Sequence, residues 1–245
     1  MINKLVAGIK KTNAPIVVGL DPTMKLIPKF LLEKNFKEYG ENLKGASEAI
    51  FEYNKGLIDA IYDLIPCVKP QIAMYESFGI DGLIAFKKTV DYCHEKGLVV
   101  IGDIKRGDIG ATSDAYAKAH FSGDFETDII TINPYMGFDT LKPFTEYCKT
   151  PNGKGIFVLL RTSNPGMVDI EQQELKAGGR VLDRTGNELN RIAAEFKTMY
   201  PEQKCSPVGA VVGCTEESDA RLLRDVYPEL FFLIPGYGAQ GGAAR

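Results

Sequence analysis

The chain contains 245 residues, of which 44% are hydrophobic and 25% are charged, and its formal net charge is −3. This length suits one large domain or two small ones, and the composition is that of an ordinary soluble globular protein. The slightly acidic balance argues against a general nucleic-acid-binding protein. A phosphate ligand would therefore have to be held by local donors and not by a basic face.

Sequence features of export, membrane insertion and zinc binding are missing. No apolar run approaches membrane-spanning length, and the first residues, MINKLVAGIKK, lack an apolar signal core. The 5 cysteines include no C-x-x-C pair, which suits reduced thiols in a cytosol-like compartment. Neither His94 nor His120 has a partner at metal-ligand spacing. We expect a cytoplasmic protein without a metal site, a membrane partner or a nucleic-acid partner.

Short apolar runs alternate with helical patterns along the whole chain. Strands are predicted at residues 15–20, 65–68, from 99 onward, and at 128–132, 155–160, 209–213 and 230–234. Between the first two runs, Ile50, Tyr53 and Leu57 recur at helical spacing on one face. Repeated β-then-α units without a linker predict an α/β fold, a (β/α)8 TIM barrel that forms a single domain over residues 1–245. The sequence stops soon after the seventh predicted strand, so we expect a C-terminally truncated chain that lacks the eighth β/α unit.

The third predicted strand leads into a stretch rich in charged residues that could perform catalysis. Residues 99–109 read V-V-I-G-D-I-K-R-G-D-I, an apolar run that ends in charged residues. Because side chains alternate along a strand, Asp103 and Lys105 should share one face, with Asp108 just past the turn. An isolated D-x-K could equally be a solvated pair or a helix cap. A helix is predicted to begin near Ser113 and Asp114, which are both good N-caps.

Other polar residues also follow predicted strands, where the active sites of α/β barrels gather. Asp21 follows the first strand, Lys69 the second, Thr162 and Ser163 the fifth, and Gln240 lies in the glycine-rich loop after the seventh. Lysines among carboxylates favour their charged form, so Lys105 is expected to be a cationic proton donor and not a Schiff-base nucleophile. The polar, glycine-rich stretch of about fifteen residues after Ser163 is long for such a loop and is a candidate lid.

Each of these residues also has a plain structural interpretation. Lys69 could be a solvated lysine, Asp21-Pro22 a simple turn, and Ser163 part of a turn-rich segment. Gln71 suits a substrate contact and a structural role equally well. The loop that begins at Pro235 spells G-x-G-x-x-G but has no helix and no acidic residue behind it, so backbone amides that cradle a phosphate are favoured over a dinucleotide site.

Several segments, in order along the chain, resemble the orotidine 5′-phosphate decarboxylase family, in particular its longer, second type. Residues 103–112 read D-I-K-R-G-D-I-G-A-T, close to the family signature D-x-K-x-x-D-I-x-x-T. The segments G-L-D-P, V-K-P-Q-I-A-M-Y-E, N-P-Y-M-G, T-S-N-P-G and P-G-Y-G-A-Q-G-G also match. Sugar-phosphate aldolases of the same superfamily share D-x-K-x-x-D, so the ordered set is more specific than that one motif.

The resemblance implies a homodimeric barrel that converts orotidine 5′-phosphate to UMP and CO2 in pyrimidine synthesis, without metal or organic cofactor. It also implies roles for residues at the matching motif positions. The charged tetrad would be Lys69, Asp103, Lys105 and Asp108, and Asp108 and Thr112 would complete the partner's site. Asp21 would hold a ribose hydroxyl, Ser163 would contact the pyrimidine with Thr162 nearby, and Gln240 would bridge ring and phosphate. The family's phosphate-binding arginine belongs to the eighth unit, and Arg245 is not in that motif.

Loss of CO2 from the pyrimidine leaves an in-plane carbanion at C6 that the ring cannot delocalise. Without a cofactor as electron sink, the protein must stabilise this charge electrostatically, and an ammonium group beside C6 can do so and then deliver its proton. This double role suits Lys105. Two alternatives remain open: a Mg²⁺-dependent hexulose-phosphate synthase type aldolase, and a non-catalytic barrel that binds a phosphate or nucleotide.

Overall fold

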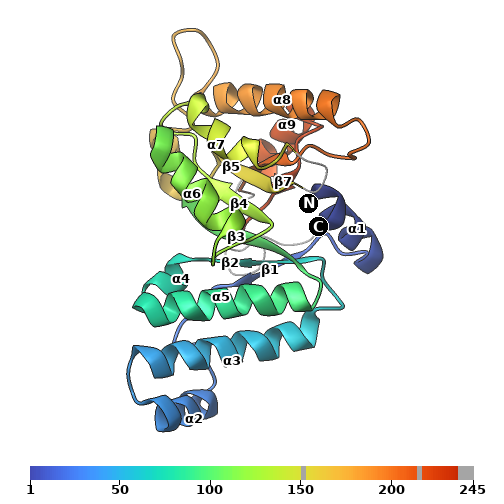
Figure 1. The fold of residues 1–245 in the computed structure, drawn as a ribbon. Helices are drawn as coiled ribbons and strands as arrows, with labels where there is room; N and C mark the ends of the chain where they lie inside the picture. Colours follow the sequence, from blue (N-terminus) through green and yellow to red (C-terminus); the bar gives the residue numbers. More distant parts are fainter. Residues whose placement is uncertain (150–152, 214–216, 237–245) are drawn as a thin grey trace. The chain divides into compact units, whose positions relative to one another are not determined.

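The strands of the protein follow one another in the sheet in the order in which they occur in the chain. The computed structural model describes residues 1–149, 153–213 and 217–236, which Figure 1 colours along the chain. Over these residues the sheet has the order β1-β2-β3-β4-β5-β6-β7. The strands are β1 (Val17–Leu20), β2 (Cys67–Pro70), β3 (Val99–Arg106), β4 (Ile129–Ile132), β5 (Gly155–Arg161), β6 (Val208–Val212) and β7 (Phe232–Leu233). Pairing is parallel between β1, β2 and β3 and between β5, β6 and β7.

Helices separate the strands, as a β/α repeat requires. They are α1 (Ile2–Thr12), α2 (Lys29–Tyr39), α3 (Leu43–Ile61), α4 (Ala73–Glu76), α5 (Gly79–Glu95), α6 (Gly110–Ser122), α7 (Lys142–Glu146), α8 (Val181–Met199) and α9 (Glu217–Val226), with short 3-10 turns η1 (Phe138–Leu141) and η2 (Pro165–Asp169). The predicted α/β class, with consecutive β/α units of a TIM barrel, is confirmed. In the described part of the chain, no helix combines the length and apolar character needed to span a bilayer.

The chain divides into two compact units. The N-terminal unit comprises Lys4–Ile104 and Lys118–Ile130, and the C-terminal unit comprises Met1–Asn3, Lys105–Ala117 and Thr131–Arg245. The division falls directly between Asp103-Ile104 and Lys105, inside the motif that carries the predicted chemistry.

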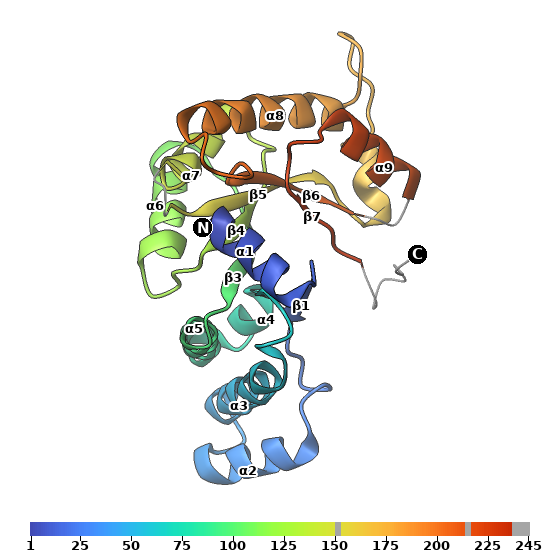
Figure 2. The ribbon, with the colours of Figure 1, turned by 90° about the vertical axis from the view of Figure 1, so that its right-hand side faces the viewer.

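The N-terminal unit packs its helices in layers beside β1, β2 and β3. Helix α3 lies between α2 and α5 (Figure 2). It begins at the N-cap Asn42, whose Oδ1 accepts a hydrogen bond from the Gly45 backbone N–H at 3.1 Å. Helix α5 approaches α4 closely because Gly82 has no side chain: a Cβ atom there would lie 1.9 Å from the Tyr75 carbonyl oxygen.

The C-terminal unit packs α8 against β5 and β6. Helix α8 begins with a capping box in which Arg180 and Asp183 bind each other's side chain and backbone. The ring of Tyr227 packs on Gly186 of this helix, and its hydroxyl donates to the Asp183 carbonyl oxygen at 3.0 Å. These contacts fix the helix at the end of the long β5–α8 connection.

Candidate functional site

Three of the predicted site residues lie in the N-terminal unit at the carboxyl ends of neighbouring parallel strands. Asp21 directly follows β1, Lys69 lies in β2 and Asp103 lies in β3. The Lys69 ammonium Nζ is 2.9 Å from Asp103 Oδ2, and the two side chains are only 16% and 8% exposed. Lys69 was predicted to follow its strand, but β2 extends to Pro70. The structure therefore brings Lys69 and Asp103 together as a largely buried ion pair.

The end of β1 is held by a buried tyrosine from the K-P-Q-I-A-M-Y-E segment. The Tyr75 hydroxyl donates to the Leu20 carbonyl oxygen at 3.1 Å, and Asn54 Nδ2 donates to that hydroxyl at 2.9 Å. Burial raises the pKa of Tyr75 above its ordinary value. This network, which the sequence reasoning missed, fixes the backbone immediately before Asp21.

Gln71 follows β2 in the N-terminal unit and is held by backbone and side-chain contacts. It forms a parallel bridge with Asp103, and its side-chain Oε1 lies 3.3 Å from the Ala73 backbone N–H, from which it accepts a hydrogen bond at the start of α4. These contacts hold Gln71 within its own segment.

Lys105 has an unusual backbone conformation in the C-terminal unit. Its φ is +47°, in the left-handed region that non-glycine residues rarely adopt. Strain of this kind costs about 1–3 kcal/mol and persists where surrounding contacts enforce it, often at functional sites. The prediction that Asp103 and Lys105 share a face assumed regular extended strand geometry, and that premise is wrong at Lys105. The side chain of Lys105 is exposed.

Two side chains, one in β4 and one just past its end, hold the backbone of Lys105. Thr131, in β4, accepts the Lys105 backbone N–H on its Oγ1 at 3.0 Å. Asn133, just past β4, donates from Nδ2 to the Lys105 carbonyl oxygen at 3.1 Å. From the sequence, Thr131 was placed in the predicted strand and Asn133 in the N-P-Y-M-G segment, and neither was given a function of its own.

Asp108 and Thr112 lie at the start of α6. The helix begins at Gly110, earlier than the predicted start near Ser113 and Asp114, because Gly110 adopts a φ of +47° that turns the chain into it. Ser113 is fully buried, and its hydroxyl donates to the Asp108 carbonyl oxygen. This contact holds the backbone of Asp108, while Thr112 is exposed in the first turn of the helix.

The segment after β5 is more ordered than a simple loop. Glu171 accepts the Thr162 backbone N–H at 2.9 Å and lies 2.6 Å from the Thr162 hydroxyl. An antiparallel bridge joins Glu174 to Arg180. Thr162 is thus bound within this segment, and Glu171 is a structural residue that the sequence reasoning missed. The backbone of the neighbouring Ser163 packs against Gly213, where an added Cβ would lie 3.1 Å away.

The predicted phosphate loop is only partly described. Pro235 follows β7 and precedes Gly236, which has a φ of +108°. Residues 237–241, which include Gln240, lie outside the described residues.

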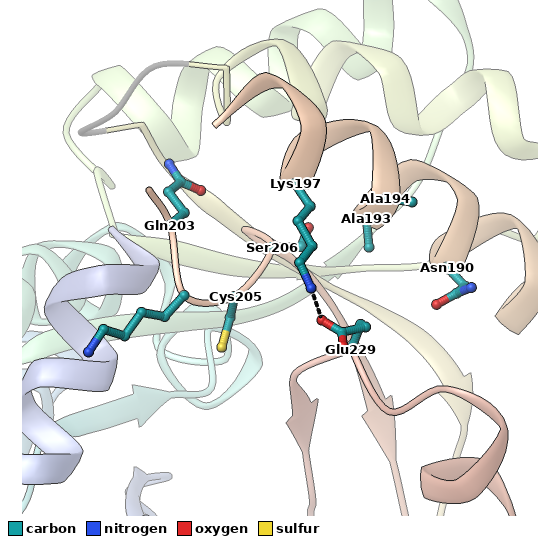
Figure 3. A pocket seen from close by; sticks show the side chains of 9 residues that line it. Asn190, Ala193, Ala194, Lys197, Gln203, Cys205, Ser206 and Glu229 are labelled. Atoms are coloured by element: carbon teal, nitrogen blue, oxygen red, sulfur yellow. Dashed lines mark hydrogen bonds and ion pairs between the residues drawn. The ribbon is translucent and has the colours of Figure 1, made fainter. Parts of the chain in front are cut away.

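A small cavity of about 110 Å³ lies elsewhere in the C-terminal unit (Figure 3). Its lining includes Cys205 and Ser206 and the ion pair between Lys197 on α8 and Glu229, with 2.5 Å from Nζ to Oε2. None of the predicted site residues lines it. The predicted chemistry is instead associated with the carboxyl ends of the strands.

Comparison with known proteins gives a consistent family assignment. A model of the family described as "Orotidine 5′-phosphate decarboxylase / HUMPS family" matches residues 14–245. An orotidine 5′-phosphate decarboxylase from Clostridium tetani is 47% identical over 245 residues, which cover 100% of this chain and 81% of the relative.

Solved structures give the same result at the level of the fold. The Leishmania donovani OMP decarboxylase superposes with a TM-score of 0.73 at 29% identity, over 96% of this chain and 78% of that one. An orotidine 5′-monophosphate decarboxylase from Methanocaldococcus jannaschii, complexed with the inhibitor BMP, has a TM-score of 0.58 at 21% identity, over 80% and 75% of the two chains. The ordered motifs, the parallel strand order and these similarities agree: the chain belongs to the orotidine 5′-phosphate decarboxylase / HUMPS family.

Proposed function

We propose that this protein converts orotidine 5′-phosphate to UMP and CO2, a step of pyrimidine biosynthesis. The observation that carries the proposal is the buried ion pair between Lys69 and Asp103 in a chain of this family. Asp103 precedes the strained Lys105 by two residues in the sequence. A buried carboxylate that already binds an ammonium group suits an alternating charge network better than a Mg²⁺ site, where the carboxylates would bind the metal.

The proposed reaction needs no cofactor. The bond between C6 and the carboxylate breaks, and its electron pair stays on C6 while CO2 leaves. The ammonium group of Lys105 stabilises this developing charge and then donates a proton to C6, after which the lysine recovers a proton from water. Asp108 would lie near the departing carboxylate. The ion pair of Lys69 and Asp103 would maintain the alternation of positive and negative groups in the tetrad.

The remaining predicted residues would bind the rest of the nucleotide. Asp21 and Lys69 would contact the ribose, and Ser163 the pyrimidine, with Thr162 nearby. Pro235 and Gln240 belong to the loop that would hold the phosphate, with Gln240 between phosphate and ring. Glycines in this loop allow backbone amides to approach a phosphate closely. Gln71 would lie beside the substrate, held by its contacts with Ala73 and Asp103.

We further propose a cytoplasmic homodimer. In a two-fold dimer the same surface serves both subunits, so Asp108 and Thr112 of one subunit can complete the site of the other. The first turn of α6 holds Thr112 exposed, which leaves it accessible to a partner.

The test is turnover of orotidine 5′-phosphate by the full-length protein in the presence of a metal chelator. The pyrimidine absorbance should change as UMP forms, at the same rate with and without chelator. Loss of activity in chelator would favour the Mg²⁺-dependent aldolase. Tight binding of UMP without turnover would favour the non-catalytic barrel.

A further inference from the structure

We propose that Thr131 and Asn133 are positioning residues that fix the Lys105 ammonium for proton transfer by holding its backbone in the left-handed conformation. This inference rests on the proposed function, because it concerns how the same lysine is placed. Neither residue carries a charge, and neither is required to contact the substrate.

The conformation of Lys105 requires such support. Among the described residues, only Lys105 and Asn13 combine a side chain other than glycine's with a positive φ. Asparagine is one of the residue types that tolerate this region, whereas lysine is not enriched there. The backbone of Lys105 would therefore relax toward an ordinary extended conformation unless its neighbours oppose it.

The contacts from Thr131 in β4 and from Asn133 just past it bind both backbone polar groups of Lys105. Thr131 is 1% exposed, so the hydroxyl that accepts the Lys105 N–H comes from a side chain fixed in the core. Asn133 donates from its side chain to the Lys105 carbonyl oxygen and from its own backbone N–H to the Arg106 carbonyl oxygen at 2.9 Å. The first two hydrogen bonds hold the peptide units on either side of the Lys105 Cα, and the third holds the next peptide unit, between Arg106 and Gly107.

Gly107 allows the carboxamide of Asn133 to approach this closely. A Cβ atom at Gly107 would lie 2.7 Å from both Nδ2 and Oδ1 of Asn133. The glycine in the sequence D-I-K-R-G-D is thus explained by the space that Asn133 occupies. The motif and the end of β4 are matched in shape as well as in hydrogen bonding.

The functional consequence follows from the geometry of the lysine side chain. The direction of its Cα–Cβ bond relative to the preceding peptide depends on φ at Lys105. A change of that dihedral therefore moves the ammonium group, at the end of a long side chain, by more than it moves the nearby backbone. Proton transfer depends steeply on the placement of the reacting groups, and a displacement of about 1 Å can cost about a hundredfold in rate.

The experiment compares Thr131→Val, which is nearly isosteric but has no hydroxyl, with Thr131→Ser, which keeps it. In Thr131→Val we expect kcat for orotidine 5′-phosphate to fall by about a hundredfold. KM should change by less than about threefold, because ground-state binding does not use the ammonium placement. Thr131→Ser should restore kcat to within about threefold of the wild type. Asn133→Ala should reproduce the loss in kcat.

Thr185→Val is the matched control. Thr185 is also a buried threonine of the C-terminal unit, but its hydroxyl donates to the Val181 carbonyl oxygen within α8. This variant should keep wild-type kcat. The inference is overturned if Thr131→Val and Asn133→Ala retain wild-type kcat, if Thr131→Ser fails to rescue, or if Thr185→Val loses as much. An inactive wild type would instead refute the proposed function, so the two failures are distinguishable.

Discussion

At the scale of single residues, the proposed reaction depends on the charge and placement of Lys105. Replacement by alanine removes both the stabilising charge and the proton donor, so we expect Lys105→Ala to lower kcat by at least about 10⁴-fold. Affinity for UMP should survive, because the ribose and phosphate contacts remain. Turnover assays together with titration calorimetry measure the two effects.

The control for this variant is Lys87→Ala, which removes a lysine paired with Asp91 on the outside of α5. It should leave kcat and UMP affinity unchanged, since exposed ion pairs contribute little. A Lys105→Ala protein that still turns over substrate at near wild-type rate would mean that another group donates the proton.

The residues that the sequence reasoning missed show where single-chain patterns stop being informative. Lys69, Asp103 and Lys105 are recognisable from their motifs, because charge at a strand end is visible in the sequence. Thr131 and Asn133 are not, because their hydrogen bonds depend on which backbone lies opposite them. Tyr75 is similar: its aromatic character predicts burial, but its hydrogen bond to the Leu20 carbonyl oxygen joins residues 55 positions apart.

At the scale of elements, β3 and β4 are tied at their amino ends by a buried carboxylate. Asp128 Oδ2 accepts the Val100 backbone N–H at 2.8 Å and lies 3.2 Å from His94 Nε2. Burial would raise the pKa of Asp128, but the hydrogen bonds from His94 and Val100 outweigh it and hold the pKa below its usual range. His94 therefore has a structural function between α5 and this strand end.

The direction of this shift predicts a pH dependence of stability. A carboxyl group whose pKa is lower in the folded state stabilises the fold above its unfolded pKa of about 4, and that contribution is lost as the pH falls through the folded value. Asp128→Asn should therefore lower the thermal unfolding midpoint at pH 7, and the difference from the wild type should shrink toward pH 3.

The matched control replaces an exposed aspartate, Asp91, by asparagine. Its partner is Lys87 on the same helix, and such i,i+4 pairs add only a few tenths of a kcal/mol. Asp91→Asn should barely change the midpoint at any pH. A difference between Asp128→Asn and wild type that stays constant from pH 7 to pH 3 would contradict the assigned pKa direction.

Strands and helices could be predicted from the sequence where a single physical cause, such as burial on both faces, produces the residue pattern. Strands buried on both faces are continuous apolar runs, so β3 and β5 are found close to their observed bounds. Prediction fails where polar residues continue a strand, as at Lys69, and where a glycine starts a helix early, as at Gly110. The sequence of the candidate lid after β5 is that of a polar loop. In the structure, the hydrogen bond from Thr162 to Glu171 and the bridge between Glu174 and Arg180 hold this segment together.

At the scale of the whole molecule, the observed strand order and the matched family are those predicted from the sequence. The dimer is a separate prediction. Several ordered motifs identify the family because they run from the first strand to the last. A dimer leaves no such mark in one chain: the expectation that Asp108 crosses to the partner comes from the family resemblance alone.

Subunit mixing tests this expectation. If each site takes Lys105 from one subunit and Asp108 from the other, a heterodimer of Lys105→Ala and Asp108→Ala contains one intact site. Random exchange of the two inactive homodimers should then restore about a quarter of wild-type activity. Mixtures that stay as inactive as their parents, although exchange is verified by mass spectrometry, would contradict a shared site.

The position of the Lys105 ammonium relative to the substrate ring can be observed in a crystal structure of the full-length protein with UMP bound. We expect the Lys105 ammonium to be directed at C6 of the pyrimidine, with its backbone still in the left-handed conformation and Asp108 supplied by the neighbouring subunit. A complex in which this ammonium is turned away from the ring toward bulk water would contradict this expectation.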